Sequence, residues 1–181
     1  RKVLNIRPLN QGIKEGEWLI LCRTHEVVQK VSETLEMYGW LYKRYGFPVV
    51  SRNYIEAMRG WTTLQNNKKI SGSSCDVIYH NMDREIIKVK NKEVSVKEIA
   101  WYDMLNGKAF NNRSNYLRSL MRSGNKLDDE PRIEVSTIHA SKGGERDNVM
   151  LITDLSYGPY KASTDNQRGR DDEARVFYVG A

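Results

Sequence analysis

Regular patterns of hydrophobic and polar positions occupy the two ends of the chain. Near the N-terminus a short apolar run, residues 18–22, predicts a buried β-strand. Hydrophobic residues then recur at helical spacing, which predicts a helix that begins after Thr24 and ends at Gly39. The apolar positions of this helix are Val27, Val28, Val31, Leu35 and Tyr38. A strand, a turn and a helix in this order form the first half of a βαβ unit.

The same kind of pattern returns after residue 131. Residues 133–137 alternate between apolar and polar, which predicts a second strand. Residues 149–152 form a continuous apolar run, as expected for a parallel strand that is covered on both faces. The segment 157–170 is rich in glycine, proline, serine and charge and predicts a mobile surface loop, which leads into a helix that opens at 171–173. Both ends of the chain therefore predict one α/β domain.

The middle of the chain has a mixed pattern. It predicts a helix over 55–64, a turn and helix start at 69–74, a hairpin over 86–96 and a helix over 114–123 that ends at Gly124. We interpret this part as a small mixed α+β subdomain. The predicted domain organisation is an α/β domain of residues 1–60 and 131–181, with residues 61–130 inserted into it.

Composition supports a globular protein without a membrane span. The chain has 181 residues, of which 39% are hydrophobic, and no apolar run approaches the ~20 residues that cross a bilayer. Cys22 and Cys75 have neither CxxC nor histidine spacing, which predicts reduced core thiols, no metal site and a cytoplasmic location. The net charge of +6 weakly favours a polyanionic partner, and an ordinary basic surface explains it as well.

A polar stretch follows the strand at 133–137. Ligands of open α/β sheets bind at the carboxyl ends of strands, where this stretch lies. Its neutral polar groups suit a phosphodiester backbone, its lysine can neutralise a phosphate, its glycines allow close backbone approach, and its glutamate can accept from sugar hydroxyls. These residues are Thr137, His139, Ser141, Lys142, Gly143, Gly144 and Glu145. A solvated polar turn is the alternative interpretation.

Three segments together resemble the motifs of superfamily 1 helicases of the UvrD/Rep/PcrA type. Residues 136–145, Ser-Thr-Ile-His-Ala-Ser-Lys-Gly-Gly-Glu, resemble motif V. Residues 172–181 resemble the first part of motif VI, residues 19–25 resemble motif IV, and the three occur in the family's order. The resemblance implies the C-terminal RecA-like (2A) domain of a helicase. Its expected fold is an α/β, RecA-like parallel sheet with helices on both faces and a small 2B-like insertion.

The resemblance also implies a function and a set of site residues. The full-length protein would be an ATP-dependent DNA helicase that uses ATP and Mg²⁺. Its partners would be single-stranded or partly duplex DNA and the N-terminal RecA-like domain of the same protein. The implied catalytic residues are Arg23 and Arg175, with Arg23 reaching the ATP phosphates and Arg175 linking the nucleotide site to the domain core. Gly144 and Glu145 would lie near the nucleotide, and the implied DNA-binding residues are Thr137, His139, Ser141 and Lys142.

The chain departs from the family pattern at several places. Gly144 replaces the usual leucine, and Cys22 replaces an aromatic residue that stacks on adenine in family members. Motif VI stops before its Thr-Arg pair, and no GxxxxGK[ST] phosphate-binding loop occurs. We therefore expect this chain alone to hold neither ATP nor Mg²⁺ and to be inactive. The alternative function is a non-enzymatic helicase-like module that binds nucleic acid or protein.

Overall fold

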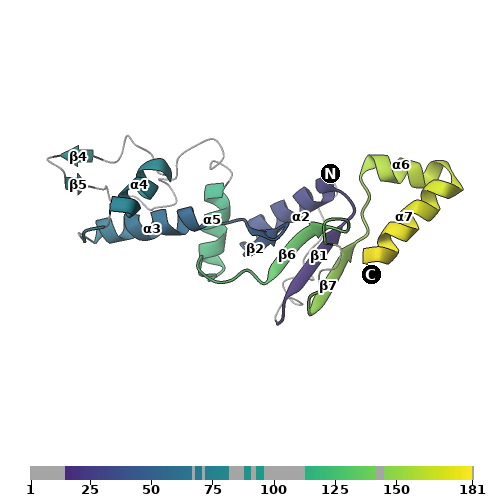
Figure 1. The fold of residues 1–181 in the computed structure, drawn as a ribbon, viewed down its shortest axis with the longest axis horizontal. Coiled ribbons are helices and arrows are strands. Elements are labelled where there is room, and N and C mark those ends of the chain that lie inside the picture. Colours follow the sequence, from purple (N-terminus) through teal and green to yellow (C-terminus); the bar gives the residue numbers. More distant parts are fainter. Residues whose placement is uncertain are drawn as a thin grey trace. The chain divides into compact units, whose positions relative to one another are not determined.

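The computed structural model describes residues 15–66, 68–70, 72–81, 88–90, 93–95, 113–141 and 145–180. Contacts between residues divide the chain into two compact units. Unit 1 comprises the described parts of 1–49 and 130–181, and unit 2 comprises those of 50–129 (Figure 1). Each unit has its own secondary structure and is described by itself.

Unit 1 is built on a five-stranded sheet. The strands β1 (Trp18–Cys22), β2 (Tyr42–Arg44), β6 (Ile133–Thr137) and β7 (Asn148–Ile152) run parallel, and β3 (Phe47–Pro48) pairs antiparallel with β2. The strand order is β3-β2-β6-β1-β7, so β1 lies between the two strands that flank the polar stretch. The predicted α/β, RecA-like fold is confirmed.

Helices cover both faces of this sheet. Leu19 and Leu21 of β1 pack with Ile138, and Val176 and Phe177 of α7 (Gln167–Gly180) pack against them. Side chains alternate between the faces of a strand, so Ile20 points to the opposite face. That face is fully buried at Ile20, and α2 (His25–Met37) contacts both β1 and β6 there. The sheet is therefore the middle layer of unit 1.

The first helix begins and ends where the sequence predicts. The Thr24 hydroxyl accepts a hydrogen bond from the N–H of Val27, and such an N-cap typically stabilises a helix by about 1 kcal/mol. Glu26 lies in the first turn, where the helix dipole favours an anion. Gly39 follows the helix at φ 68°, a conformation that glycine adopts without steric cost. Local capping signals are thus sufficient to define α2.

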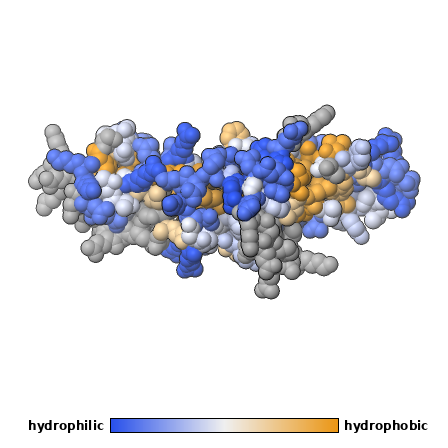
Figure 2. Space-filling model, turned by 90° about the horizontal axis from the view of Figure 1, so that it is seen from below, coloured by the Kyte–Doolittle hydropathy of each residue, from blue (hydrophilic) through white to orange (hydrophobic). Residues whose placement is uncertain are grey.

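Two predictions for the C-terminal third are wrong. The predicted loop at 157–170 is α6 (Tyr157–Asp165) followed by the first turn of α7. Its apparent helix breakers, Gly158 and Pro159, fall in the first turn of α6, where a missing N–H costs nothing. The predicted coverage of β7 on both faces also fails, because Val149 is 49% exposed and no residue of β7 is fully buried. Figure 2 shows hydrophobic surface on this side of unit 1.

Unit 2 contains both helices and strands, as the sequence predicts. Its described elements are α3 (Arg52–Gln65), α4 (Gly72–Asn81), β4 (Lys88–Lys90), β5 (Glu93–Ser95) and α5 (Arg113–Arg122). The strands β4 and β5 form the predicted antiparallel hairpin. Trp61 on α3 is completely buried, as expected for a core residue. The predicted boundary at residue 60 falls inside α3, whereas the contacts divide the chain at 49/50, because a continuous helix belongs to one unit.

In the part of the chain that the structure describes, no helix combines the length and the apolar character that a membrane crossing requires.

Candidate functional site

The carboxyl edge of the sheet contains a topological switch point. After β1 the chain crosses to β2, on the far side of β6, and after β6 it crosses to β7, on the far side of β1. Neighbouring parallel strands whose connections leave in opposite directions open a crevice, the usual ligand site of such sheets. The Ile138 N–H donates to the Cys22 carbonyl at 3.0 Å, so the segments after β1 and β6 lie directly side by side.

Arg23 stands at this edge in a fixed orientation. Its Nε donates to Glu173 Oε2 at 2.6 Å and its Nη2 donates to Glu173 Oε1 at 3.0 Å. The Arg23 side chain is 21% exposed and that of Glu173 is 11% exposed. A two-point bond of this kind fixes the plane of a guanidinium as well as its position. Nη1 of Arg23 makes no hydrogen bond within the described part of the chain, so it remains available to an anion.

Glu173 is the functional residue that the sequence analysis missed. It lies on α7, and its partner Arg23 is 150 positions away in the sequence. The spacing of Glu173 to Val176, Phe177 and Gly180 is i, i+3, i+4 and i+7, so all four lie on one face of the helix. A carboxylate on the apolar face of a helix is stable only with a cationic partner. This spacing was the signal that could have revealed it.

The polar stretch begins with a turn that its own hydroxyls stabilise. The Thr137 carbonyl accepts from the N–H groups of Ala140 and Ser141, each at 3.1 Å, and from the Ser141 hydroxyl at 3.1 Å. The Thr137 hydroxyl accepts from the Ala140 N–H at 3.3 Å. Thr137 is only 6% exposed, whereas His139 is exposed. Thr137 and Ser141 therefore support the turn, and His139 is the side chain that the turn presents to solvent.

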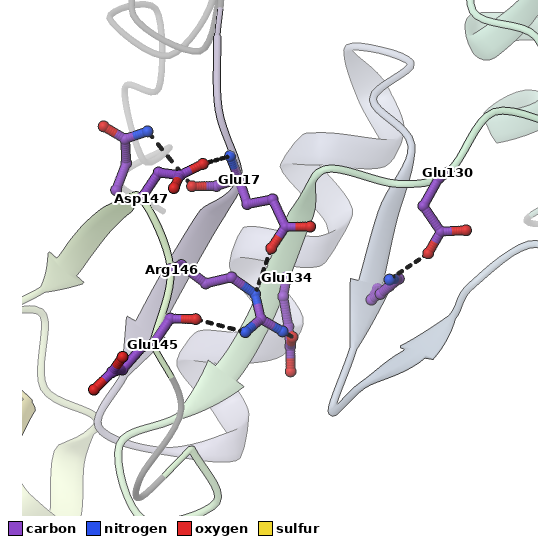
Figure 3. A network of polar contacts seen from close by, with 8 residues as sticks. Glu17, Glu130, Glu134, Glu145, Arg146 and Asp147 are labelled. Atoms are coloured by element: carbon purple, nitrogen blue, oxygen red, sulfur yellow. Dashed lines mark hydrogen bonds and ion pairs between the residues drawn. The ribbon is translucent and has the colours of Figure 1, made fainter.

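The two residues that follow Glu145 form bonds at the opposite, amino end of the sheet (Figure 3). The next residue, Arg146, places Nη2 2.8 Å from Glu134 Oε2 and Nε 3.2 Å from Glu17 Oε2. The Glu17 N–H also donates to Asp147 Oδ2 at 2.8 Å, just before β1 begins. At about 3.3 Å per strand residue, this end is roughly 16 Å from the carboxyl edge. Among the described residues Arg23 is bonded to Glu173 and not to Glu145, and the sugar contact of Glu145 stays a prediction.

The remaining predicted site residues either lie apart from the crevice or fall outside the residues that the structure describes. Arg175 is exposed on α7, and its Nη1 lies 3.3 Å from Asp172 Oδ1. The connection to the domain core that the resemblance implies for Arg175 is made in this structure by Glu173. Lys142 and Gly144 fall outside the described residues, so their predicted roles stay predictions.

A comparison with family models places this geometry in context. Residues 67–181, more than half of the chain, match the model of the UvrD-like helicase C-terminal domain. The chain belongs to this family. The matched stretch of this UvrD-like domain contains segments 136–145 and 172–181 but not 19–25. Comparisons with curated proteins and with solved structures give no match. Membership implies an interaction with nucleic acid in general.

The motif IV segment of the UvrD-like domain is joined to the matched stretch by direct contacts. β1 is hydrogen-bonded to β6 on one side and to β7 on the other. The side-chain pair of Arg23 and Glu173 adds a link from the end of β1 to α7. The three segments that resemble motifs IV, V and VI therefore form one structural unit.

Cys22 in this UvrD-like domain is inert toward solvent. It is completely buried, and burial raises the pKa of its thiol to about 12. Because the thiolate is the reactive form, we expect Cys22 to react with a thiol reagent more than ~100-fold more slowly than Cys75 in the native protein. Counting modified thiols before and after addition of urea checks this. Cys75→Ser should abolish fast labelling, and fast labelling of that variant would contradict the burial of Cys22.

Proposed function

We propose that this domain is the C-terminal motor half of an ATP-dependent DNA helicase. The supporting observation is the fixed guanidinium of Arg23, which lies beside the polar turn after β6 at the switch point of the sheet. Because this fixed cation lies next to the proposed nucleic-acid contact, binding of an ATP phosphate by Arg23 can be coupled to movement along a DNA strand. In the intact protein, closure toward an N-terminal RecA-like domain would move His139 together with the DNA strand that it contacts. Release of the hydrolysis products would let the two domains separate again.

The residues at the crevice suit one contact to ATP rather than a complete nucleotide site. Nη1 of Arg23 can donate to a phosphate oxygen, and Glu173 keeps the guanidinium from turning away. ATP supplies the free energy for closure, and Mg²⁺ neutralises phosphate charge. Residues 15–180, leaving out the undescribed gaps, contain no cluster of three His, Cys, Asp or Glu side chains that could hold a metal ion. We propose that the N-terminal domain provides the Mg²⁺ ligands and the phosphate-binding loop.

The turn after β6 offers a contact to the phosphodiester backbone of DNA. His139 is exposed there, and Thr137 and Ser141 hold the turn in shape through their hydroxyl groups. A side chain on a rigid turn moves together with the β-sheet, so a DNA strand bound to that side chain moves with the sheet as well. We therefore propose that His139 contacts the DNA and that Thr137 and Ser141 orient the contact.

We expect His139→Ala to reduce the stimulation of ATP hydrolysis by single-stranded DNA about 10-fold, the effect of one lost hydrogen bond to a charged group. The measurement is steady-state ATPase activity of the protein that contains this domain and its N-terminal partner domain, with and without oligonucleotide. His80→Ala, an exposed histidine on α4 of unit 2, is the matched control and should behave as wild type. Unchanged stimulation in His139→Ala would refute the contact, and wild-type hydrolysis that ignores DNA would refute the motor function.

A further inference from the structure

The hairpin between β2 and β3 carries an unusual residue in its turn. Tyr45 has φ 52° and Gly46 has φ 79°, so both central residues of the two-residue turn are left-handed. Such turns favour Asn-Gly or Asp-Gly, because a bulky side chain at positive φ is strained. Strained residues persist where the surrounding structure holds them, and they cluster at functional sites. The ring of Tyr45 is therefore a candidate for a function.

Tyr45 lies at the carboxyl edge of the sheet, next to the segments already described. Its N–H donates to the Val135 carbonyl of β6 at 3.1 Å. Its hydroxyl lies 2.5 Å from Nδ1 of His25, and the two rings meet edge to face with centroids 5.5 Å apart. His25 itself begins α2, two residues after Arg23. Because β2 neighbours β6 in the sheet, the edge that carries His139 continues onto Tyr45.

An exposed ring and a cation extend this edge. Phe47 pairs with Arg44 across the hairpin, and directly opposed residues of antiparallel strands project to the same face. Phe47 is 78% exposed, although burial of a phenylalanine is strongly favoured. Nη1 of Arg44 donates to the neutral Gln29 Oε1 at 2.8 Å, and no carboxylate of the described residues forms an ion pair with Arg44. An exposed aromatic ring thus lies beside an uncompensated positive charge.

We propose that His25, Arg44, Tyr45 and Phe47 form a stacking platform that binds unpaired bases of a single-stranded nucleic acid. Phe47 and Tyr45 present ring faces to bases, and Arg44 contacts the backbone phosphate between them. A strand that crosses the turn after β6 reaches the platform next, since β2 is the adjacent strand. The proposal rests on the proposed function and adds to it a base contact made by the β2–β3 hairpin. Aromatic rings beside a cation favour a nucleic-acid partner over an apolar protein partner. An apolar protein surface would bury the Arg44 charge without an anion to pair with it.

Phe47→Ala tests the platform without affecting the core, because Phe47 is exposed. We expect this variant of the 181-residue chain to bind a short fluorescein-labelled oligothymidylate about 10-fold more weakly, the typical effect of one lost stacking contact. Fluorescence anisotropy at several salt concentrations measures the affinity. The slope of log affinity against log salt concentration should equal that of the wild type, since no phosphate contact is removed. Tyr157→Ala is the matched control, because Tyr157 is an aromatic residue of α6 that is 77% exposed, and it should bind as wild type.

Tyr45→Asn separates binding from folding. Asparagine accepts positive φ more readily than tyrosine, so we expect this variant to be at least as stable to urea as wild type while it binds several-fold more weakly. An abasic oligonucleotide of the same length provides the chemical control. Phe47→Ala should bind it as well as the wild-type chain does, because the base that stacks is missing.

The outcomes distinguish the platform from the function on which it rests. If the wild-type chain binds no single strand, both proposals fail. If it binds and Phe47→Ala has no effect, or weakens abasic and base-containing strands equally, the platform alone is refuted. Sedimentation of the wild-type chain as a dimer, with Phe47→Ala as a monomer, would instead assign the patch to contact with a second copy.

Discussion

Replacement of Arg23 by alanine is expected to lower DNA-stimulated ATP hydrolysis about 100-fold, in the protein that joins this domain to its N-terminal partner. Removal of one pre-oriented donor to a developing phosphate charge typically has an effect of this size. The affinity for single-stranded DNA should change less than about threefold, since the proposed DNA contacts lie on the neighbouring turn and hairpin. The measurements are steady-state ATPase activity and oligonucleotide anisotropy on the same preparations.

Two further variants show whether the orientation of Arg23 matters. Arg23→Lys keeps the positive charge but lacks the planar guanidinium that Glu173 binds at two points. We therefore expect its ATPase activity to lie between those of Arg23→Ala and the wild type. Arg168→Ala removes an exposed arginine of α7 and should leave hydrolysis unchanged. If Arg23→Ala hydrolysed ATP at the wild-type rate, the assignment of residues 19–25 as motif IV would be wrong.

Glu173→Ala is expected to destabilise unit 1 by about 2 kcal/mol. Loss of one partner of a buried ion pair costs about 3–5 kcal/mol, because the remaining charge is left without compensation. The 21% exposure of the Arg23 side chain lets water relieve a part of that cost. Urea unfolding of the chain, followed by circular dichroism, measures the change.

A double-mutant cycle isolates the pair itself. Arg23→Ala with Glu173→Ala removes both charges, so the double variant should be more stable than the sum of the single effects predicts, by about 1–2 kcal/mol. Asp172→Ala is the adjacent control: its ion pair with Arg175 is exposed, so stability should change by less than about 0.5 kcal/mol. Strict additivity in the cycle would show that Arg23 and Glu173 do not depend on each other in solution.

The two wrong predictions have different physical origins. The loop predicted over 157–170 rested on the presence of Gly158 and Pro159, but the position of a breaker within a helix decides its effect, and both lie in the first turn of α6. The coverage of β7 was predicted from its apolar run, but the burial of a strand depends on which other elements pack on its two faces. The first error concerns the position of a residue within its helix, and the second concerns packing between segments that are distant in the sequence.

The amino-acid sequence by itself determined β1, α2, β6 and β7 of unit 1, because period and capping are local properties. The ends of α2 follow from Thr24 and Gly39, and the turn after β6 follows from side chains within five positions. Only the tertiary structure decided that β1 lies between β6 and β7, that Glu173 binds Arg23 and that Arg146 binds Glu17 and Glu134 at the amino end of the sheet. Strand order and long-range ion pairs depend on the packing of segments up to 150 positions apart, which local patterns do not encode.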